Sequence, residues 1–430
     1  MASELLQQVR VVEPSSGTNR VTDVWIAQGE VAALDAAAER VPPETVARDC
    51  RGLVLAPGLC DLYSHSGEPG NEQRETLASL AAAAVAGGFT RLGILPDTAP
   101  PLDGPAGVAH LQQCLAAHPP APAPTVHLWG ALTHQRAGER MAELGELARA
   151  GVTGFSDARP IGDLGLVHRL LQYVQPLGKP VALSAADATL RSNGVLREGI
   201  AAARAGLAGD PGCSEAAALA ALLETVAAVG TPVHLMRIST ARGVELIAEA
   251  KARGLPVTAS ATWMHLLLEA DAAGTYDPNL RLDPPLGTPE DRAALVEGVR
   301  SGTLDAIAID RAAYTAEEKT VAFAEAPPGA IGLELALPLL WQAFVASGQW
   351  SALDLWRALS AAPRRCLHQA PASLAAGEPA ELVLFDPHAH WSVTQETLHT
   401  MGTNTPWYGQ PIAGRVVRVW QPPADSCNQG

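Results

Sequence analysis

The stretch Pro57–Gly70, PGLCDLYSHSGEPG, joins an apolar run to a polar loop. The run Leu53–Ala56 leads through a Pro-Gly pair into Asp61–His65, a pattern typical of a strand that ends in a loop. Side chains two residues apart in an extended chain share a face, so His-x-His at a strand end directs two imidazoles at one metal ion. Here Tyr63 takes the first of those positions and His65 the second, so one imidazole of such a pair is missing.

Beyond this stretch, apolar strands alternate with long helices rich in alanine and leucine. Regular alternation over roughly 300 residues predicts a parallel (β/α)8 TIM barrel. Functional side chains of such barrels follow the strands, and here special residues do so, namely His65, Asp97, Asp157, Ser184, Arg237, His265 and Asp310. The expected strands are 90–95, 125–129, 154–156, 180–184, 232–238, 256–261 and 306–309.

The two chain ends have a different pattern of apolar and polar residues. Residues 8–56 and 380–421 consist of short alternating segments separated by turn residues, which is typical of small antiparallel strands. We therefore predict that residues 1–56 and 371–430 join in one composite β-sandwich, and that residues 57–370 form the barrel.

Composition narrows the range of functions. The net charge of −15 without any block of Lys or Arg argues against a nucleic-acid partner. No uninterrupted apolar segment is long enough for a membrane span, and the N-terminus lacks the layout of a signal peptide, so we expect no membrane partner and a cytoplasmic location. The six cysteines show no CxxC spacing and are expected to be reduced; they are Cys50, Cys60, Cys114, Cys213, Cys366 and Cys427.

An ordered series of phrases over nearly the whole chain resembles the class I dihydroorotases of the amidohydrolase superfamily. The phrases are Pro57-Gly58-Leu59 with Glu68-Pro69-Gly70, Ala86–Thr90, Leu95–Thr98, Ile238–Thr240, His265–Leu268, Pro284–Leu286, Asp305–Ala308 and Gly332–Glu334. The resemblance implies a barrel with a composite β-sandwich, bound zinc, and reversible cyclisation of carbamoyl-aspartate to dihydroorotate.

This chain departs from the family at its zinc ligands. The opening motif of the family is His-x-His-x-Arg, and Tyr63, His65 and Gly67 stand in those places. A phenol with a pKa near 10 is a poor zinc ligand at neutral pH, and Gly67 offers no cation to a substrate carboxylate. The next two zinc histidines are replaced by Ser184 and Arg237. A guanidinium has no lone pair for a metal and repels it.

Other site positions have also changed. The aspartate-rich loop of the family is shortened to Phe155–Arg159, and we expect Asp157 to be a solvated turn residue. Asp310 keeps the place of the metal-linked catalytic base, but the histidines of that phrase are Arg311 and Tyr314.

The substrate-binding phrases gain acids and lose a cation. Asp97 replaces an asparagine, and Asp283 and Gly287 replace an asparagine and an arginine, whereas His265 is kept. His234, three residues before Arg237, is expected on the opposite face and unable to replace the lost ligand.

These losses predict a zinc-free, catalytically inactive pseudoenzyme of the dihydroorotase type. Some degenerate relatives are structural partners of aspartate carbamoyltransferase, so the resemblance implies that partner, and we also expect a homo-oligomer. We expect Arg237 to reach toward Asp310 or Asp157, with Arg311 as a second cation.

Two alternatives remain open. One is an active dihydroorotase or other cyclic amidohydrolase with an altered metal site, with zinc if a ligand set survives, using Asp310 with His65 or His265. The other is a sensor that binds a small anion through Arg237 and Arg311.

Overall fold

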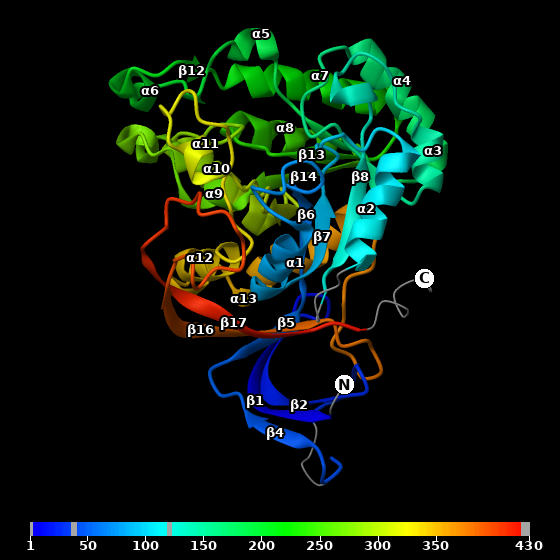
Figure 1. The fold of residues 1–430 in the computed structure, drawn as a ribbon, viewed down its shortest axis with the longest axis vertical. Coiled ribbons are helices and arrows are strands. Elements are labelled where there is room, and N and C mark those ends of the chain that lie inside the picture. Colours follow the sequence, from blue (N-terminus) through cyan, green and yellow to red (C-terminus); the bar gives the residue numbers. More distant parts are fainter. Residues whose placement is uncertain (1–2, 36–40, 118–122, 423–430) are drawn as a thin grey trace.

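The computed structural model describes residues 3–35, 41–117 and 123–422. Within these ranges eight parallel strands form a closed barrel surrounded by helices (Figure 1). The barrel strands are β6 (Leu59–Ser64), β7 (Phe89–Ile94), β8 (Thr125–Gly130), β9 (Gly154–Phe155), β10 (Ala182–Ser184), β13 (Val233–Met236), β14 (Val257–Thr262) and β15 (Ala306–Ala308). The fold class expected from the alternation of strands and helices is confirmed.

Two sets of contacts close the barrel. A parallel bridge between Phe155 and Val181 links the β6–β9 sheet to the β10–β15 sheet. On the other side, the Asp310 amide donates to the Tyr63 carbonyl at 3.1 Å, and the His65 amide donates to the Arg311 carbonyl at 2.8 Å. The residues just beyond β6 and β15 therefore lie side by side, as a shared mouth requires.

The helices begin and end where local chemistry favours it. Thr76, Asp163, Thr240 and Thr288 cap helix N-termini with their side-chain oxygens, and Gly302 ends a helix in the left-handed conformation. The helices around the barrel are α1 (Leu77–Ala86), α2 (Pro105–Ala117), α3 (Leu144–Arg149), α4 (Leu164–Val174), α7 (Cys213–Val229), α8 (Ala241–Ala252), α10 (Pro289–Ser301), α12 (Ala336–Leu340), α13 (Ala352–Trp356) and α14 (Ala362–Cys366).

Shorter elements lie in the loops. They are α5 (Ala188–Arg191), β11 (Leu196–Arg197), α6 (Ile200–Ala205), β12 (Gly209–Asp210), α9 (Trp263–Leu267) and α11 (Ala316–Lys319). No helix of the described ranges is long and apolar enough to cross a membrane.

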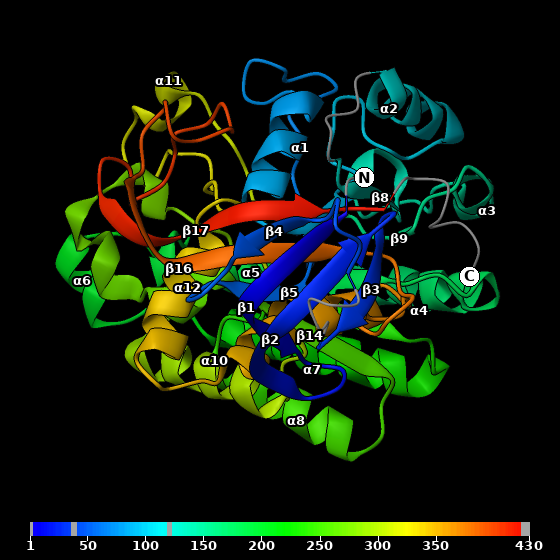
Figure 2. The same cartoon turned by 90° about the horizontal axis from the view of Figure 1, so that it is seen from below.

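Strands from both chain ends form one continuous sheet across the bottom of the barrel (Figure 2). Its path is β17-β16-β5-β1-β2-β3, with β4 paired to β1. The strands are β1 (Glu4–Glu13), β2 (Thr18–Ala27), β3 (Glu30–Leu34), β4 (Val46–Asp49), β5 (Val54–Pro57), β16 (Leu382–Ser392) and β17 (Pro411–Trp420). The two ends are thus joined in one sheet, as the short alternating segments at both ends predict.

Successive side chains of β5 and β16 point alternately toward the barrel and toward the terminal sheet, so these strands pack against both. Val54 and Phe385 pack into the main core, whereas Leu55 and Leu384 pack into a separate core of the sheet. The run expected as one strand is in fact two, because the chain leaves the sheet and enters the barrel at Gly58. A Cβ at Gly58 would lie 2.2 Å from the Thr90 side chain, so only glycine fits this crossing.

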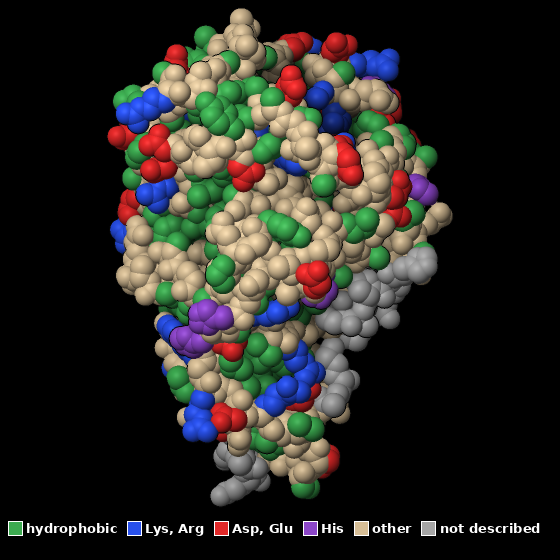
Figure 3. Space-filling view, turned by 60° about the vertical axis from the view of Figure 1, so that its left-hand side comes forward, with side chains coloured by type: hydrophobic (Ala, Val, Ile, Leu, Met, Phe, Trp, Pro, Cys, Tyr) green, Lys and Arg blue, Asp and Glu red, His purple; other side chains and the backbone are tan. Residues whose placement is uncertain are grey.

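Two further expectations concern the surface and the cysteines. On the face seen in Figure 3, acidic and basic side chains are interspersed without a continuous basic patch. The cysteines in the described ranges (Cys50, Cys60, Cys114, Cys213 and Cys366) are unpaired, and Cys427 lies outside those ranges.

Candidate functional site

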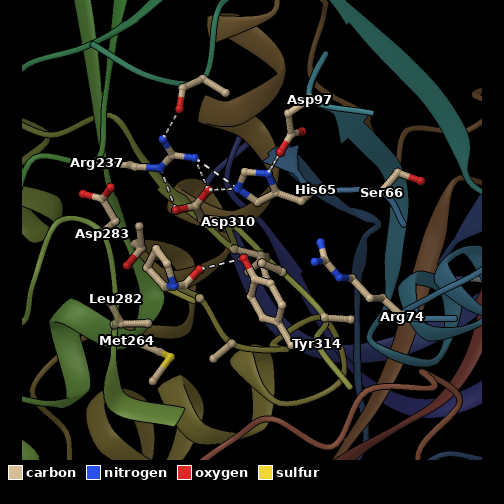
Figure 4. A pocket seen from close by; sticks show the side chains of 18 of the residues that line it. His65, Ser66, Arg74, Asp97, Arg237, Met264, Leu282, Asp283, Asp310 and Tyr314 are labelled. Carbon is tan, nitrogen blue, oxygen red and sulfur yellow. Dashed lines mark hydrogen bonds and ion pairs between the residues drawn. The ribbon is translucent and has the colours of Figure 1, made fainter. Parts of the chain in front are cut away.

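The ends of the barrel strands surround a pocket of about 310 Å³ (Figure 4). Of the residues singled out in the sequence, those that line it are His65, Gly67, Asp97, Arg237, His265, Asp283, Asp310 and Tyr314. Tyr63, Asp157, Ser184 and Arg311 do not line it. The barrel mouth therefore brings most of the remnant positions together but excludes four of them.

Arg237 and Asp310 form the central contact of the site. The Arg237 Nε atom donates to Asp310 Oδ2 at 2.7 Å, and Nη2 donates to Oδ1 at 2.6 Å, so the pair is bidentate. The side chains are only 9% and 13% exposed. Burial opposes the charged forms, but the ion pair outweighs it, raising the pKa of Arg237 and lowering that of Asp310. The expected arginine–carboxylate pair is confirmed with Asp310 as its acid.

His65 lies between two carboxylates. Its Nδ1 atom is 2.5 Å from Asp97 Oδ2, and its Nε2 atom is 3.6 Å from Asp310 Oδ1. Burial lowers the pKa of His65, but the two carboxylates outweigh burial and raise that pKa to about 9. At neutral pH the imidazole is therefore a cation without a lone pair for a metal.

The backbone at the mouth is strained. Ala158, Arg237 and Asp310 adopt positive φ angles of 58°, 58° and 50°. The Arg237 Nη1 atom also donates to the Ala158 carbonyl at 2.8 Å, which links all three residues. Left-handed backbone at non-glycine residues costs about 1–3 kcal/mol each and persists where surrounding contacts hold it, often at functional sites.

Tyr63 is buried beneath the ion pair. Its hydroxyl lies 2.7 Å from Ser260 Oγ and accepts a hydrogen bond from the Arg237 amide at 3.2 Å. The Arg237 guanidinium is 5.6 Å from the centre of the Tyr63 ring. Burial and the nearby Asp310 raise the pKa of the phenol above its usual value. Tyr63 thus packs as a neutral side chain and offers no phenolate.

Asp157 has a structural role that differs from the solvated turn expected. It is buried and accepts hydrogen bonds from the amides of Leu132 and Thr133, at 2.8 and 3.0 Å, and from the Thr133 hydroxyl at 2.5 Å. The expectation of a solvated residue is wrong because this acid ties together two loops of the mouth. The Ser184 hydroxyl donates to the Met236 sulfur at 3.8 Å.

Two further histidines, His265 and His234, are neutral. His265 lies 2.6 Å from Thr262 Oγ1 through Nδ1 and 3.1 Å from the Pro284 carbonyl through Nε2, and burial lowers its pKa to about 4. His234 contacts Thr258 and Ser260 inside the barrel, where burial lowers its pKa to about 3. His234 is therefore no substitute for the ligand lost at Arg237.

Arg311 differs from the expectation of a second cation beside Asp310. Its side chain is almost fully buried and pairs with Glu75, and its Nη1 atom donates to the His65 carbonyl at 3.0 Å. Nη2 lies 3.2 Å from Thr400 Oγ1, in the segment between β16 and β17. The expected contact with Asp310 is wrong because adjacent residues at a strand end point to different sides. Nothing in the sequence indicated Glu75 as the partner.

At Gly67, in the place of the substrate arginine of the family, there is no room for a side chain. A Cβ there would lie 2.4 Å from the Glu75 carbonyl oxygen. An arginine could therefore not be restored at this position without moving the backbone. Arg74, on the same loop, lines the pocket instead, and no motif in the sequence pointed to it.

The residues present do not fit a zinc ion. Across the described residues, no group of three or more His, Cys, Asp or Glu side chains is placed to hold a metal. The Arg237 guanidinium occupies both oxygens of Asp310, and its positive charge repels a divalent cation.

Comparisons with known proteins identify the family. A family model described as "Dihydro-orotase-like" matches residues 52–242. A "Probable dihydroorotase-like protein" of Synechocystis sp. is 46% identical over 98% of this chain and 100% of its own length. This chain belongs to the dihydroorotase family of the amidohydrolase superfamily.

More distant similarities agree with this membership. A protein named "Dihydroorotase" from Anaeromyxobacter sp. is 39% identical over 95% of this dihydroorotase-like chain and 94% of its own length. Among solved structures, the L-hydantoinase (dihydropyrimidinase) of Arthrobacter aurescens has a TM-score of 0.83 at 22% identity, covering 97% of this chain and 94% of that one. At this identity the likeness shows a shared fold alone.

Proposed function

We propose that this dihydroorotase-like protein does not catalyse zinc-dependent cyclisation and is a structural or regulatory partner in cytoplasmic pyrimidine biosynthesis, with aspartate carbamoyltransferase as its partner. The observation that carries this proposal is the bidentate ion pair between Arg237 and Asp310. The acid that would serve as catalytic base is already bound by an internal cation. Without a metal it has no activated water to deprotonate.

The pattern of losses and retention supports a non-catalytic role. The barrel is closed and its core is packed, while the groups that would bind a metal and a substrate carboxylate are replaced at Tyr63, Gly67, Ser184 and Arg237. A chain that keeps its fold and lacks its chemistry is suited to work through its surface. The choice of partner rests on the resemblance to degenerate family members that assemble with aspartate carbamoyltransferase.

The first test measures metal content and carbamoyl-aspartate cyclisation on the same purified sample. We expect neither stoichiometric zinc nor turnover, before or after incubation with zinc. The control is the relative from Anaeromyxobacter sp., named "Dihydroorotase", purified in the same way. Zinc near one or two per chain together with turnover would favour the alternative, an active cyclic amidohydrolase with an altered metal site.

The second test addresses the partner. The chain is co-expressed with the aspartate carbamoyltransferase of the same organism, and the mixture is separated by size-exclusion chromatography with light scattering. We expect a complex with a fixed ratio of the two chains, and the mass of the free chain measures its own oligomeric state. Separate elution of both proteins at micromolar concentration would contradict the partnership.

A further inference from the structure

A second pocket lies at the opposite end of the barrel from the mouth. Its volume is about 260 Å³, and it is formed where β10, β13 and β14 begin, beside the C-terminal end of α14. It shares no lining residue with the pocket at the mouth. A ligand could therefore bind here whether or not the mouth is catalytically active.

The walls of this second pocket are apolar. Pro180, Pro232 and Pro256 each lie at the entry to a barrel strand, and three valines and a leucine complete the wall. A proline has no backbone N–H, so these entries present no amide donor. The carbonyls of Pro180 and Pro256 already accept hydrogen bonds from the amides of Phe155 and Val233. Such walls are suited to a flat apolar group.

The buried end of the pocket is polar, but its groups bind one another. The His234 Nδ1 atom is 2.9 Å from Thr258 Oγ1, and its Nε2 atom is 2.9 Å from Ser260 Oγ. Burial raises the pKa of the Cys366 thiol to about 12, so that side chain is also neutral. This end therefore offers a ligand neither a charge nor a free strong donor.

The rim of the pocket has donors without partners. Arg365 and His368 line the pocket and are exposed, and neither side chain has a hydrogen bond or ion pair with another described residue. No Asp or Glu of the described ranges lines the pocket, and Asp305, near Cys366, is already paired with Lys251 at 2.7 Å. A free guanidinium without a neighbouring acid favours an anion.

The cations at the mouth are placed differently. Arg237 pairs with Asp310 and Arg311 with Glu75, so the anion sensor expected at these two arginines is disfavoured. Arg159 lines the mouth pocket and has no ion pair with an acid of the described residues. A test of anion binding must therefore separate Arg159 from Arg365.

We propose that the second pocket binds a small aromatic monocarboxylate. Its ring would lie against the proline-lined walls, and its carboxylate would reach Arg365 and His368 at the rim. One guanidinium matches one carboxylate. A second carboxylate at the buried end would find no free donor, and an aromatic amine would be repelled by Arg365.

Benzoate is the probe for this proposal, measured by calorimetry and thermal shift. We expect one benzoate to bind per chain and to raise the melting temperature in a saturable way. Benzyl alcohol and benzylamine, which keep the ring, should bind at least about tenfold more weakly because they lose the charged contact. Acetate, which keeps the charge, should also bind at least about tenfold more weakly because it lacks the ring.

Matched variants locate the binding site. Arg365→Gln, at an exposed position, should weaken benzoate by about tenfold, whereas Arg159→Gln at the mouth should leave its affinity unchanged. Leu255→Ala removes part of the wall and should weaken benzoate but not acetate.

Three outcomes would overturn the proposal. They are no binding of benzoate at millimolar concentration, an affinity equal to that of acetate, and a loss of binding in Arg159→Gln instead of Arg365→Gln. None of these results depends on zinc content or cyclisation, which test the proposed function separately.

Discussion

Arginines occupy two positions at which the family has histidines. Their side chains point in different directions and bind different partners. Arg237, after β13, turns into the barrel mouth, pairs with Asp310 and lines the pocket. Arg311, after β15, turns away from the mouth, pairs with Glu75 and contacts the segment between β16 and β17. One is 9% exposed beside a cavity, and the other is 1% exposed within packed protein.

The two arginines show two different roles of a buried cation. The Arg311–Glu75 pair joins three distant parts of the chain, because Glu75 also accepts from the Thr400 hydroxyl and from the Met401 amide. The Arg237–Asp310 pair sits on strained backbone and keeps one side open to a pocket. We infer that the first stabilises the fold, whereas the second compensates a charge left by the lost metal site.

Arg311→Ala tests this distinction with the largest expected effect. The substitution leaves the Glu75 carboxylate buried without its cation, and breaking such a pair typically costs about 3–5 kcal/mol. The free energy of unfolding in urea measures the loss. Arg20→Ala, at an exposed pair with Asp35 in the terminal sheet, is the control and should change little. Equal stability of Arg311→Ala and the native chain would disprove the fold-stabilising role.

Arg237→Ala should have a smaller effect. It removes a charge-assisted hydrogen-bonded contact from a site that water can reach, and we expect a loss of about 1–3 kcal/mol in urea unfolding. Adding Asp310→Asn to Arg237→Ala should recover part of the lost stability, because a neutral amide then replaces the unpaired carboxylate. A strictly additive double variant would show that the two residues do not interact.

The contrast also shows what the sequence alone determines. Strand–helix alternation and the textures of the ends predict the barrel and the shared sheet, since both follow from local hydrophobic periodicity. The Arg237–Asp310 pair follows from two strand ends that meet at one mouth. The direction of Arg311 does not, because Glu75 and Thr400 are distant in sequence and carry no motif. The burial of Asp157 likewise depends on a loop that only tertiary packing brings near.

His65 gives the barrel mouth a pH dependence of its own. Asp97, Asp310 and Arg237 surround it, and its pKa is raised to about 9. A raised pKa contributes stability that is fully present below the ordinary value near 6.5 and is lost as pH rises through about 9. We expect a decline of about 1–2 kcal/mol between these limits, since partial exposure screens the interaction. Urea unfolding from pH 6 to 10 measures it, and His65→Asn should flatten the slope; an unchanged slope would contradict the assignment.

Tyr63→His has the smallest expected effect, because we expect it to restore no carbamoyl-aspartate cyclisation. The variant restores one imidazole of the family motif, but Arg237 still holds both oxygens of Asp310, and His65 still carries a proton at neutral pH. A zinc site with too few free donors binds weakly, so neither stoichiometric zinc nor carbamoyl-aspartate cyclisation is expected. Tyr63→Phe, which removes only the hydroxyl and its contacts with Ser260 and the Arg237 amide, is the matched control for stability. Measurable cyclisation by Tyr63→His would mean that the Arg237 cation yields to a metal, and the mouth would then be a suppressed active site.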